Sequence, residues 1–433
     1  MFMRGIVVCR AIICAVMLWS GLIAPTRAEE PKRLEMWTHW GEEPMKRRFI
    51  EETVREFEAA NPNVTITLRW IPKMRLYQNL RQSLSQGIGP DIFYADPYPA
   101  VIKKWIDNGD VLNMRDRIDW RRFTPDSYQG LSQYGENAIY GVPLEMGEYA
   151  IYYNARIFAE AGIPIPTSGM MTTDEFLHAA RAFRAKGIIP VAVGNKDRGI
   201  ASNMLFQGLL LRFAGMETLL GLKTGASSWT APDIAAAFHY MKTLVDAGVF
   251  PENMNLLTYK EGYTLFVEGQ AAMYVDGTWF FSKIADAQGQ FPASLQARLG
   301  AMDFPLAPNG KGNAAIERMN GGGYLVRRQT RFPDEAAAFL NFMTSAENAR
   351  KWTRYTQSPV SVNVPLAEAV SAPFLAEFFA ARQDCREVLS PGIADLLSAK
   401  EYESWVRDVG ILFLGGDLSV EETLQRLEAA ASK

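Results

Sequence analysis

Trp279 is the residue whose type and position most clearly suggest contact with a ligand. It comes just after Asp276 and Gly277, which we expect to end a short buried strand over residues 271–275. In open α/β sheets, ligands bind outside the carboxyl ends of the strands. An indole placed there is either a core side chain or a flat platform on which a ligand stacks. Taken alone it is more often core, so the surrounding pattern has to decide.

That pattern covers residues 266–281, FVEGQAAMYVDGTWFF. Tyr263, Phe266 and Val267 recur at helical spacing, and Gly269 stands where a helix C-cap is expected. Helix, glycine, buried strand and tryptophan in this order resemble the signature of the extracellular solute-binding proteins of ABC importers, the group that includes maltose-binding protein. In those relatives a tryptophan at this position stacks on a sugar ring. The resemblance implies a carbohydrate-binding receptor and runs through nearly the whole mature chain.

The N-terminal part has the strand–helix–strand order of a βαβ unit. Alternating apolar residues predict strands near residues 34–38 and 64–70, with a helix between them. The loop after the first strand, with Trp40 and Glu43, therefore lies at the ligand-facing edge of a parallel sheet. A third buried strand is predicted before the loop that begins with Asp96. GPDIFYADPY resembles the family here, which implies an aromatic contact and a hydroxyl-binding acid.

GVPLEMGEYAIYYN, residues 141–154, resembles the first connection between the two lobes of this family. Relatives often carry an acid midway along this segment, where the present sequence has Gly147. Glu145 or Glu148 could replace that acid, or either could be a solvated surface carboxylate. The departure from the family pattern leaves the identity of the ligand open.

The resemblance implies a type II-like periplasmic-binding-protein fold, in which two α/β lobes each contain a mixed sheet flanked by helices. Gly321 and Gly322 mark the second connection, because consecutive glycines let backbone approach a ligand and tolerate the motion of a hinge. Three crossing hinge segments are expected, near 145–150, 319–324 and 358–362. The implied division is a signal peptide over 1–28, an N-terminal lobe of 29–146 plus 321–358, and a C-terminal lobe of 147–320 plus 359–433.

The expected ligand contacts fall into three chemical groups. Aromatic faces stack on the C–H surface of a sugar, carboxylates accept hydrogen bonds from its hydroxyls, and loop or backbone groups add polar contacts. The family also brings a late aromatic to the sugar near Tyr402 and Trp405. The loop after a strand at 188–193 suits hydroxyl groups, although a plain exposed turn fits it equally well. The expected site residues are Trp40, Tyr94 and Trp279 as platforms, Glu43, Asp96, Glu145 and Asp276 as acceptors, and Asn195, Arg198, Gly321 and Gly322 as further contacts.

Residues 1–28 have the order of a secretory signal. Arg4 and Arg10 flank the start of an apolar run, and small residues lead to Ala28, after which we expect cleavage. Attachment of a lipid to Cys14 would require a small residue before it, and the residue there is not small. A soluble periplasmic protein without a lipid anchor is therefore expected.

The mature chain is acidic. Removing the three arginines of the signal leaves 42 basic residues against 48 acidic ones, a net charge of −6. That balance argues against nucleic acid or an anionic membrane surface as the partner. Cys385 is the one cysteine left after cleavage, so we expect no internal disulfide and a fold that depends on its core. We also expect a monomer. The partners implied by the resemblance are a carbohydrate and the membrane permease subunits of an ABC importer, with no cofactor and no metal.

Two other functions stay open. The sequence contains no phosphate-binding loop and no nucleophile elbow, and its three histidines lack metal-ligand spacing. An exported glycoside hydrolase is the weaker alternative, because 48 acids allow many carboxylate pairs in space. Within the importer class, the alternative is a non-sugar ligand such as a phosphodiester or a polyamine. An anion would need converging cations, for which Lys196 and Arg198 are the candidates.

Overall fold

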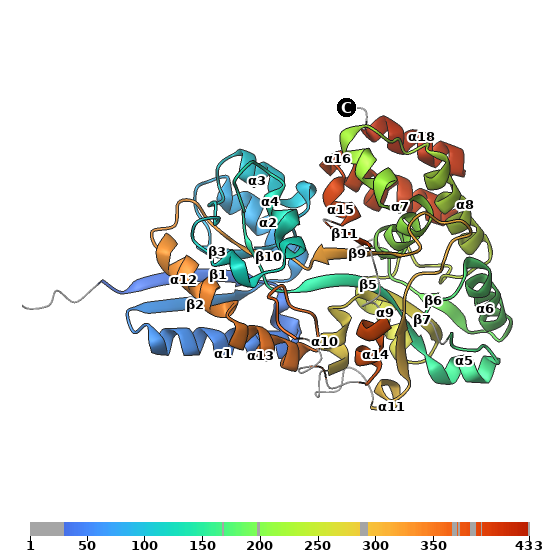
Figure 1. The fold of residues 1–433 in the computed structure, drawn as a ribbon, viewed down its shortest axis with the longest axis horizontal. Helices are drawn as coiled ribbons and strands as arrows, with labels where there is room; N and C mark the ends of the chain where they lie inside the picture. The colour runs from blue at the N-terminus through green and yellow to red at the C-terminus, as the bar shows by residue number, and fades with distance from the viewer. Residues whose placement is uncertain are drawn as a thin grey trace, which may run out of the picture.

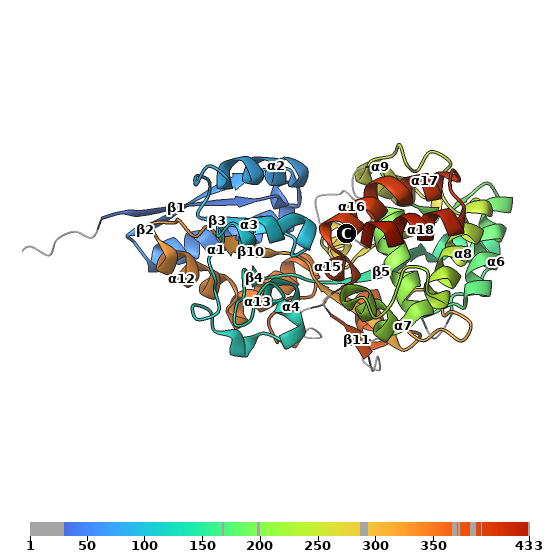
Figure 2. The ribbon, with the colours of Figure 1, turned by 90° about the horizontal axis from the view of Figure 1, so that it is seen from above.

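The computed structural model describes residues 30–166, 169–196, 200–285, 293–365, 370, 373–381, 387–390 and 392–431. The predicted signal peptide and Arg198 lie outside these residues. Figure 1 shows two lobes, and Figure 2 shows the same division from above. The first lobe is the half drawn mainly in blue and orange, and the second is the half drawn mainly in green, yellow and red.

The sheet of the first lobe has the strand order β2-β1-β3-β10-β4. β1 runs parallel to β2 and β3, whereas β10 is antiparallel to β3 and β4, so the sheet is mixed. The carboxyl ends of β1 and β3 consequently lie at the same edge, as the βαβ prediction requires. The strands are β1 (Lys32–Thr38), β2 (Val64–Trp70), β3 (Ile92–Ala95), β4 (Val142–Pro143) and β10 (Gly323–Val326).

The sheet of the second lobe has the order β11-β9-β5-β7-β6, and β8 pairs with β5 off this path. The long strand β5 is antiparallel to β7, β8 and β9, while β6 and β7 are parallel. Parallel pairing of β6 and β7 aligns the carboxyl end of β7 with that of β6. The strands are β5 (Met146–Asn154), β6 (Ile189–Ala192), β7 (Ala271–Gly277), β8 (Leu299–Met302), β9 (Ala315–Asn320) and β11 (Glu387–Leu389).

Helices cover the first sheet because each buries an apolar stripe. In α1, Phe49, Val54 and Phe57 are buried, as their spacing predicts, and Pro44 is the first helical residue. In Figure 1, α1 and α13 lie on one side of the sheet and α2 and α3 on the other. The helices are α1 (Pro44–Ala60), α2 (Lys73–Leu84), α3 (Lys104–Asp107), α4 (Gln129–Ser132), α12 (Pro333–Met343) and α13 (Ala346–Thr356), with the short turns η1 (Trp40–Glu42), η2 (Pro99–Lys103), η3 (Trp120–Arg122) and η4 (Pro125–Tyr128).

The second lobe contains more helix than the first. The predicted capping box at Thr172 is present, with the Thr172 hydroxyl accepting from the Glu175 N–H. Residues 203–224, mostly in α7, are long and apolar enough to cross a membrane, but 67% of that apolar window is buried inside the protein, as in a core helix. The helices are α5 (Ala155–Ala161), α6 (Thr173–Ala185), α7 (Phe206–Thr224), α8 (Pro232–Asp246), α9 (Tyr259–Val267), α10 (Phe280–Ala285), α11 (Ala293–Gln296), α14 (Pro373–Ala381), α15 (Ile393–Leu396), α16 (Ala399–Glu403), α17 (Gly410–Gly415) and α18 (Val420–Ala431), with η5 (Ile200–Leu205) and η6 (Ser404–Val409).

Each lobe has its own hydrophobic core. The core of the first lobe draws its residues from 34–144 and 324–364, and that of the second from 149–319 and 375–427. Both lobes are thus discontinuous in sequence. The precise lobe boundaries given above stay a prediction.

Three segments connect the lobes and are hydrogen-bonded to one another. Glu145 joins β4 of the first sheet to β5 of the second, and its carbonyl oxygen accepts from the Gly321 N–H at 2.9 Å. The Met146 N–H donates to the Pro359 carbonyl oxygen at 3.2 Å, and the Ser361 N–H donates to that of Leu144 at 2.9 Å. The three segments therefore lie side by side as one waist. The first two cross where the sequence predicts, whereas residues 360–364 of the third still contribute to the first core, so the chain passes to the second lobe after them.

Candidate functional site

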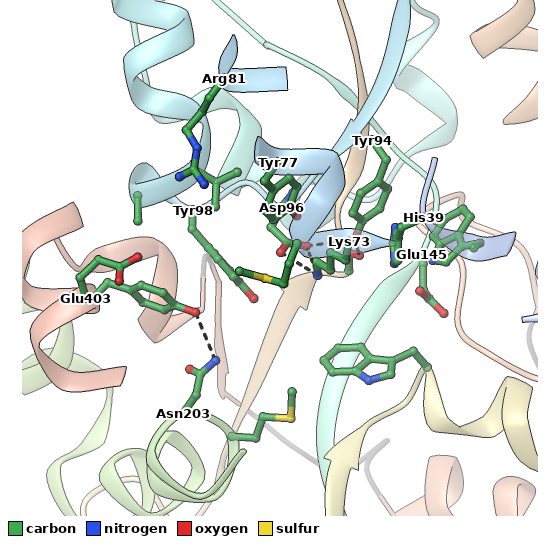
Figure 3. A pocket seen from close by; sticks show the side chains of 18 of the residues that line it. His39, Lys73, Tyr77, Arg81, Tyr94, Asp96, Tyr98, Glu145, Asn203 and Glu403 are labelled. Carbon is green, nitrogen blue, oxygen red and sulfur yellow. Dashed lines mark hydrogen bonds and ion pairs between the residues drawn. The ribbon is translucent and has the colours of Figure 1, made fainter. Parts of the chain in front are cut away.

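A cavity of about 160 Å³ lies between the lobes, beside the waist. Its walls come from the carboxyl ends of strands in both sheets, from α2, and from the C-terminal helices (Figure 3). The first lobe and the crossings contribute His39, Trp40, Glu43, Lys46, Lys73, Met74, Tyr77, Arg81, Tyr94, Asp96, Tyr98, Ala100, Val101, Trp105, Glu145 and Gly321, and the second lobe contributes Asn203, Met204, Trp279, Tyr402, Glu403 and Arg407.

Trp279 stands at the carboxyl end of β7, where the sequence placed it. The strand runs two residues further than expected, through Gly277. The indole is half-buried, and it lies edge-on to Tyr149 with ring centroids 5.9 Å apart. A side chain at Gly277 would place Cβ 2.3 Å from the indole, so glycine there is a steric requirement. Part of the ring packs and part faces the cavity.

Asp276 lies behind Trp279 and is not part of the cavity wall. Its side chain is fully buried, and Oδ1 accepts from the Trp279 Nε1–H at 2.7 Å and from the Gly277 N–H at 2.9 Å. Oδ2 accepts from two tyrosine hydroxyls, those of Tyr259 at 2.5 Å and Tyr274 at 2.9 Å. Burial raises the pKa of Asp276, and these hydrogen bonds act against that increase. Asp276 thus positions the indole, a role different from the hydroxyl acceptor expected from the sequence.

Gly147 makes room for this arrangement. A Cβ at this position would lie 3.1 Å from the Trp279 ring and 3.0 Å from the Met319 side chain. A side chain at this position would therefore require the indole or Met319 to shift by a few tenths of an ångström. Glu145, two residues earlier, lines the cavity, whereas Glu148 pairs with Arg318, whose Nε lies 3.0 Å from Glu148 Oε1.

Trp40 and Tyr94 line the cavity but expose little of their rings. Each is 2% exposed, and their ring centroids lie 5.3 Å apart. The Tyr94 hydroxyl lies 2.6 Å from the Gly321 carbonyl oxygen and 3.0 Å from Asp96 Oδ1. Gly322 has a φ of 102°, and a Cβ there would come within 2.0 Å of that hydroxyl. Gly322 therefore allows Tyr94 to reach the second crossing.

Lys46 is a buried cation that sequence reasoning missed. It is 1% exposed, and its Nζ lies 3.1 Å from Glu43 Oε2 and 3.0 Å from Glu145 Oε2. The ammonium also lies 5.1 Å from the centroid of the Trp40 ring. The available signal was position, because Lys46 precedes Phe49 by three residues on the buried stripe of α1.

The charged groups of this cluster shift one another's pKa values in different directions. Burial alone raises the pKa of a carboxyl, but Lys46, Lys283 and His39 hold the pKa of Glu43 well below its ordinary value. Burial raises the pKa of Glu145, and Lys46 offsets this only in part. Burial lowers the pKa of Lys46, yet the two carboxylates raise it overall. The cluster is best described as one carboxylate tightly paired with Lys46 and a second that is more easily protonated.

Asp96 is paired with another cation that the sequence did not single out. Lys73 Nζ lies 2.8 Å from Asp96 Oδ1 and 2.7 Å from Oδ2. Lys73, Tyr77 and Arg81 are spaced four residues apart, so they share the face of α2 that lines the cavity (Figure 3). The predicted acceptor therefore reaches the cavity as half of an ion pair.

The two late aromatic candidates, Tyr402 and Trp405, lie in different surroundings. Tyr402 lines the cavity, and its hydroxyl accepts from Asn203 Nδ2 at 3.4 Å. Trp405 is 2% exposed and packs against Phe206 in the second core.

Asn195 lies away from the cavity wall. It is 1% exposed, Nδ2 donates to Asn255 Oδ1 at 2.8 Å, and Oδ1 accepts from the Ala201 N–H at 3.1 Å. It therefore holds the loop in shape. Arg198 lies outside the described residues. Within them, no group of three or more His, Cys, Asp or Glu side chains could hold a metal ion.

Residues 42–350 match the family model of the bacterial extracellular solute-binding proteins. The chain is 24% identical to a multiple sugar-binding protein of Streptococcus mutans over 322 residues, which span 72% of each chain. It is 22% identical to a lactose-binding protein of Rhizobium radiobacter over 302 residues, 68% of this chain and 66% of that one.

Among solved structures, a chitin oligosaccharide binding protein superposes with a TM-score of 0.82 at 25% identity, covering 92% of this chain and 98% of that one. This similarity confirms the two-lobed α/β fold predicted from the sequence.

Proposed function

This chain belongs to the bacterial extracellular solute-binding protein family, and we propose that it is the receptor of an ABC importer, capturing a carbohydrate between its lobes and delivering it to the membrane permease. Relatives that bind multiple sugars and lactose support a carbohydrate as the ligand. The ligand is a monosaccharide or an oligosaccharide.

The cavity beside Trp279 carries this proposal. It combines an indole face with carboxylates from three elements, Glu43, Asp96 and Glu145. Glu145 Oε1 is buried and has no hydrogen-bond partner among the described residues, so it can accept from a ligand hydroxyl. Aromatic faces stack on the C–H surfaces of sugars, and charged acceptors form the stronger hydrogen bonds to their hydroxyls.

The waist suits opening and closing of the lobes. Gly321 and Gly322 lie between β9 and β10, where the chain passes from one sheet to the other. The Ser282 hydroxyl of the second lobe lies 3.3 Å from Glu43 Oε2 of the first, so the lobes touch beside the cavity. Closing around a sugar would remove water from both faces and strengthen the polar contacts. The closed form is the one that the permease would recognise.

The protein is proposed to bind without catalysis. The family consists of binding proteins, and two carboxylates of the cavity, Glu43 and Glu145, share Lys46 between them. A sugar bound by this protein should be recovered unchanged.

The family is extracellular, so the protein acts outside the cytoplasm. We place it in the periplasm, with cleavage after Ala28 and no lipid on Cys14. N-terminal sequencing and intact mass of the exported protein test this. A first residue of Glu29 supports the proposal, and a retained leader or a lipid adduct contradicts it.

A thermal-shift screen tests the function itself. Mono- and oligosaccharides of several linkages are added singly, with polyamines and phosphodiesters as the comparison set. A ligand at a hundredfold its dissociation constant stabilises the folded state by about 2.7 kcal/mol. The hit is then recovered and its mass measured. Stabilisation by a sugar that returns intact supports a receptor, whereas stabilisation by the comparison set alone, or cleavage of the sugar, overturns it.

A further inference from the structure

A second, larger cavity lies between the same two lobes. It encloses about 870 Å³, within the range of about 300–1,000 Å³ that ligand pockets usually have, whereas the first cavity lies below that range. The first lobe contributes Pro99, Lys103, Gln133 and Tyr134, and the second contributes the end of α7 and the segment around α15 and α16. Lys223 Nζ donates to Gln133 Oε1 at 2.8 Å, which joins the lobes at this point.

The two cavities share one wall. In the first lobe, Tyr98 and Ala100 line the first cavity and Pro99, between them, lines the second. In the second lobe, Tyr402 lines the first cavity, and its neighbour Glu401 lines the second. The wall is therefore built from the start of η2 and from α16.

The rings of Tyr98 and Tyr402 meet across this wall, with centroids 5.5 Å apart and planes tilted by 33°. Both side chains are half-buried, and Figure 3 shows Tyr98 beside the hydrogen bond from Asn203. Two aromatic rings at this point can either separate the cavities or turn to present their faces to a chain that passes between them.

The second cavity has the polar groups that hydroxyls require. Asp395 is 1% exposed, lines this cavity, and has an Oδ1 atom without a hydrogen-bond partner among the described residues. A buried acceptor left without a donor is unfavourable, so a ligand hydroxyl that reached it would be stabilised. Lys103, Gln133 and Ser398 add donors and acceptors on the two facing walls.

We propose that the two cavities form one groove, divided by the Tyr98 and Tyr402 rings, and that the ligand is an oligosaccharide whose further units occupy the second cavity. This inference rests on the proposed function and adds the length of the ligand to it. A monosaccharide would use the first cavity alone.

The test is a length series measured by calorimetry. Cello-, xylo-, chito- and malto-oligosaccharides from one to six units are titrated into the wild-type protein and two variants. Ala399→Trp places an indole into the second cavity from an exposed position on its wall. Lys400→Trp places the same side chain at the next, exposed residue, which does not line that cavity, and is the matched control.

We expect affinity to rise with length beyond two units, and Ala399→Trp to weaken the longest binder by about tenfold or more while short members and Lys400→Trp are unaffected. Equal affinity at all lengths, or equal effects of the two variants on the longest member, overturns the groove but leaves the receptor function in place. If no sugar of any length binds, the proposed function fails and the groove with it. If Ala399→Trp lowers the melting temperature of the protein, Lys103→Ala is measured in its place, with Lys104→Ala as the control. The same comparison of affinity for the longest member then decides.

Discussion

The indole Nε1–H of Trp279 donates a 2.7 Å hydrogen bond to Oδ1 of Asp276, a carboxylate that is fully buried behind it. This bond fixes which face of the indole the cavity receives. The same carboxylate also accepts from the Tyr259 and Tyr274 hydroxyls, so three aromatic side chains are oriented by one acid. The aromatic platform and its support thus form one unit at the end of β7.

Asp276→Asn tests that support. The amide keeps the shape but replaces one acceptor oxygen with a donor, so at least one of the surrounding donors is left unsatisfied. We expect a loss of about 1–3 kcal/mol in the free energy of unfolding, measured in urea, together with weaker sugar binding. Asp246→Asn, at an exposed i,i+4 pair with Lys242, should change stability by less than about 0.5 kcal/mol. Equal and small effects of the two variants would contradict a supporting role for Asp276.

Lys46→Met tests the buried charge cluster. Removing the ammonium leaves Glu43 and Glu145 without their common partner, and breaking a buried pair in this way costs about 3–5 kcal/mol. Adding Glu145→Gln to Lys46→Met should recover part of the loss, because one buried charge is then removed as well. Lys242→Met removes an exposed ammonium and is the control. Chemical denaturation measures all three, and a Lys46→Met loss as small as the control would show that the cluster is well solvated.

Glu317 should contribute to the change of the free energy of unfolding with pH. Its carboxyl is buried, Oε1 accepts from the Ile393 N–H at 2.8 Å, and burial raises its pKa to about 7. The unfolded value is about 4.3, so between these pH values the folded state holds a proton that the unfolded state has released. The free energy of unfolding should therefore fall as pH rises from about 4.3 to 7, by on the order of 3 kcal/mol from this group.

Glu317→Gln removes the titration but keeps the oxygen that accepts from Ile393. The variant should gain stability relative to the wild type as pH increases from 5 to 8, in urea unfolding at fixed ionic strength. Asp395 is buried nearby with a pKa raised by burial and by Glu317, so a slope of the same sign should persist in the variant. Glu387→Gln, an exposed acid on β11, serves as the control. A stability difference that does not vary with pH would contradict the raised pKa.

Sequence pattern predicted the parts of the site that depend on strand ends. Trp40, Glu43 and Asp96 follow parallel strands of one sheet, Tyr94 is near the end of one of those strands, and Trp279 follows a strand of the other sheet. Because strand periodicity fixes where a strand ends, it also fixes which loops reach the cavity. The segments that cross between the lobes were predicted from their resemblance to the family.

The same reasoning could not predict which side chains pair inside the site. Lys46 and Lys73 approach their carboxylates from α1 and α2, and such pairing depends on how helices pack on a sheet. Asn195 also follows a strand, but a hydrogen bond to Asn255 turns it inward. Asp276 was expected to face the ligand, and only the neighbouring tyrosines and the indole show that it faces the protein.

Trp279→Ala, titrated by calorimetry with the best sugar of the screen, tests the central claim most directly. An aromatic contact of this kind contributes about 1–3 kcal/mol, so affinity should fall by roughly ten- to a hundredfold while the melting temperature changes little. Trp120→Ala is the matched control, because Trp120 is also half-buried and donates its Nε1–H at 2.8 Å, to the Arg115 carbonyl oxygen, but does not line the cavity. If Trp279→Ala instead loses about 3–5 kcal/mol of stability and the folded fraction binds with unchanged affinity, the indole is core and the account is contradicted.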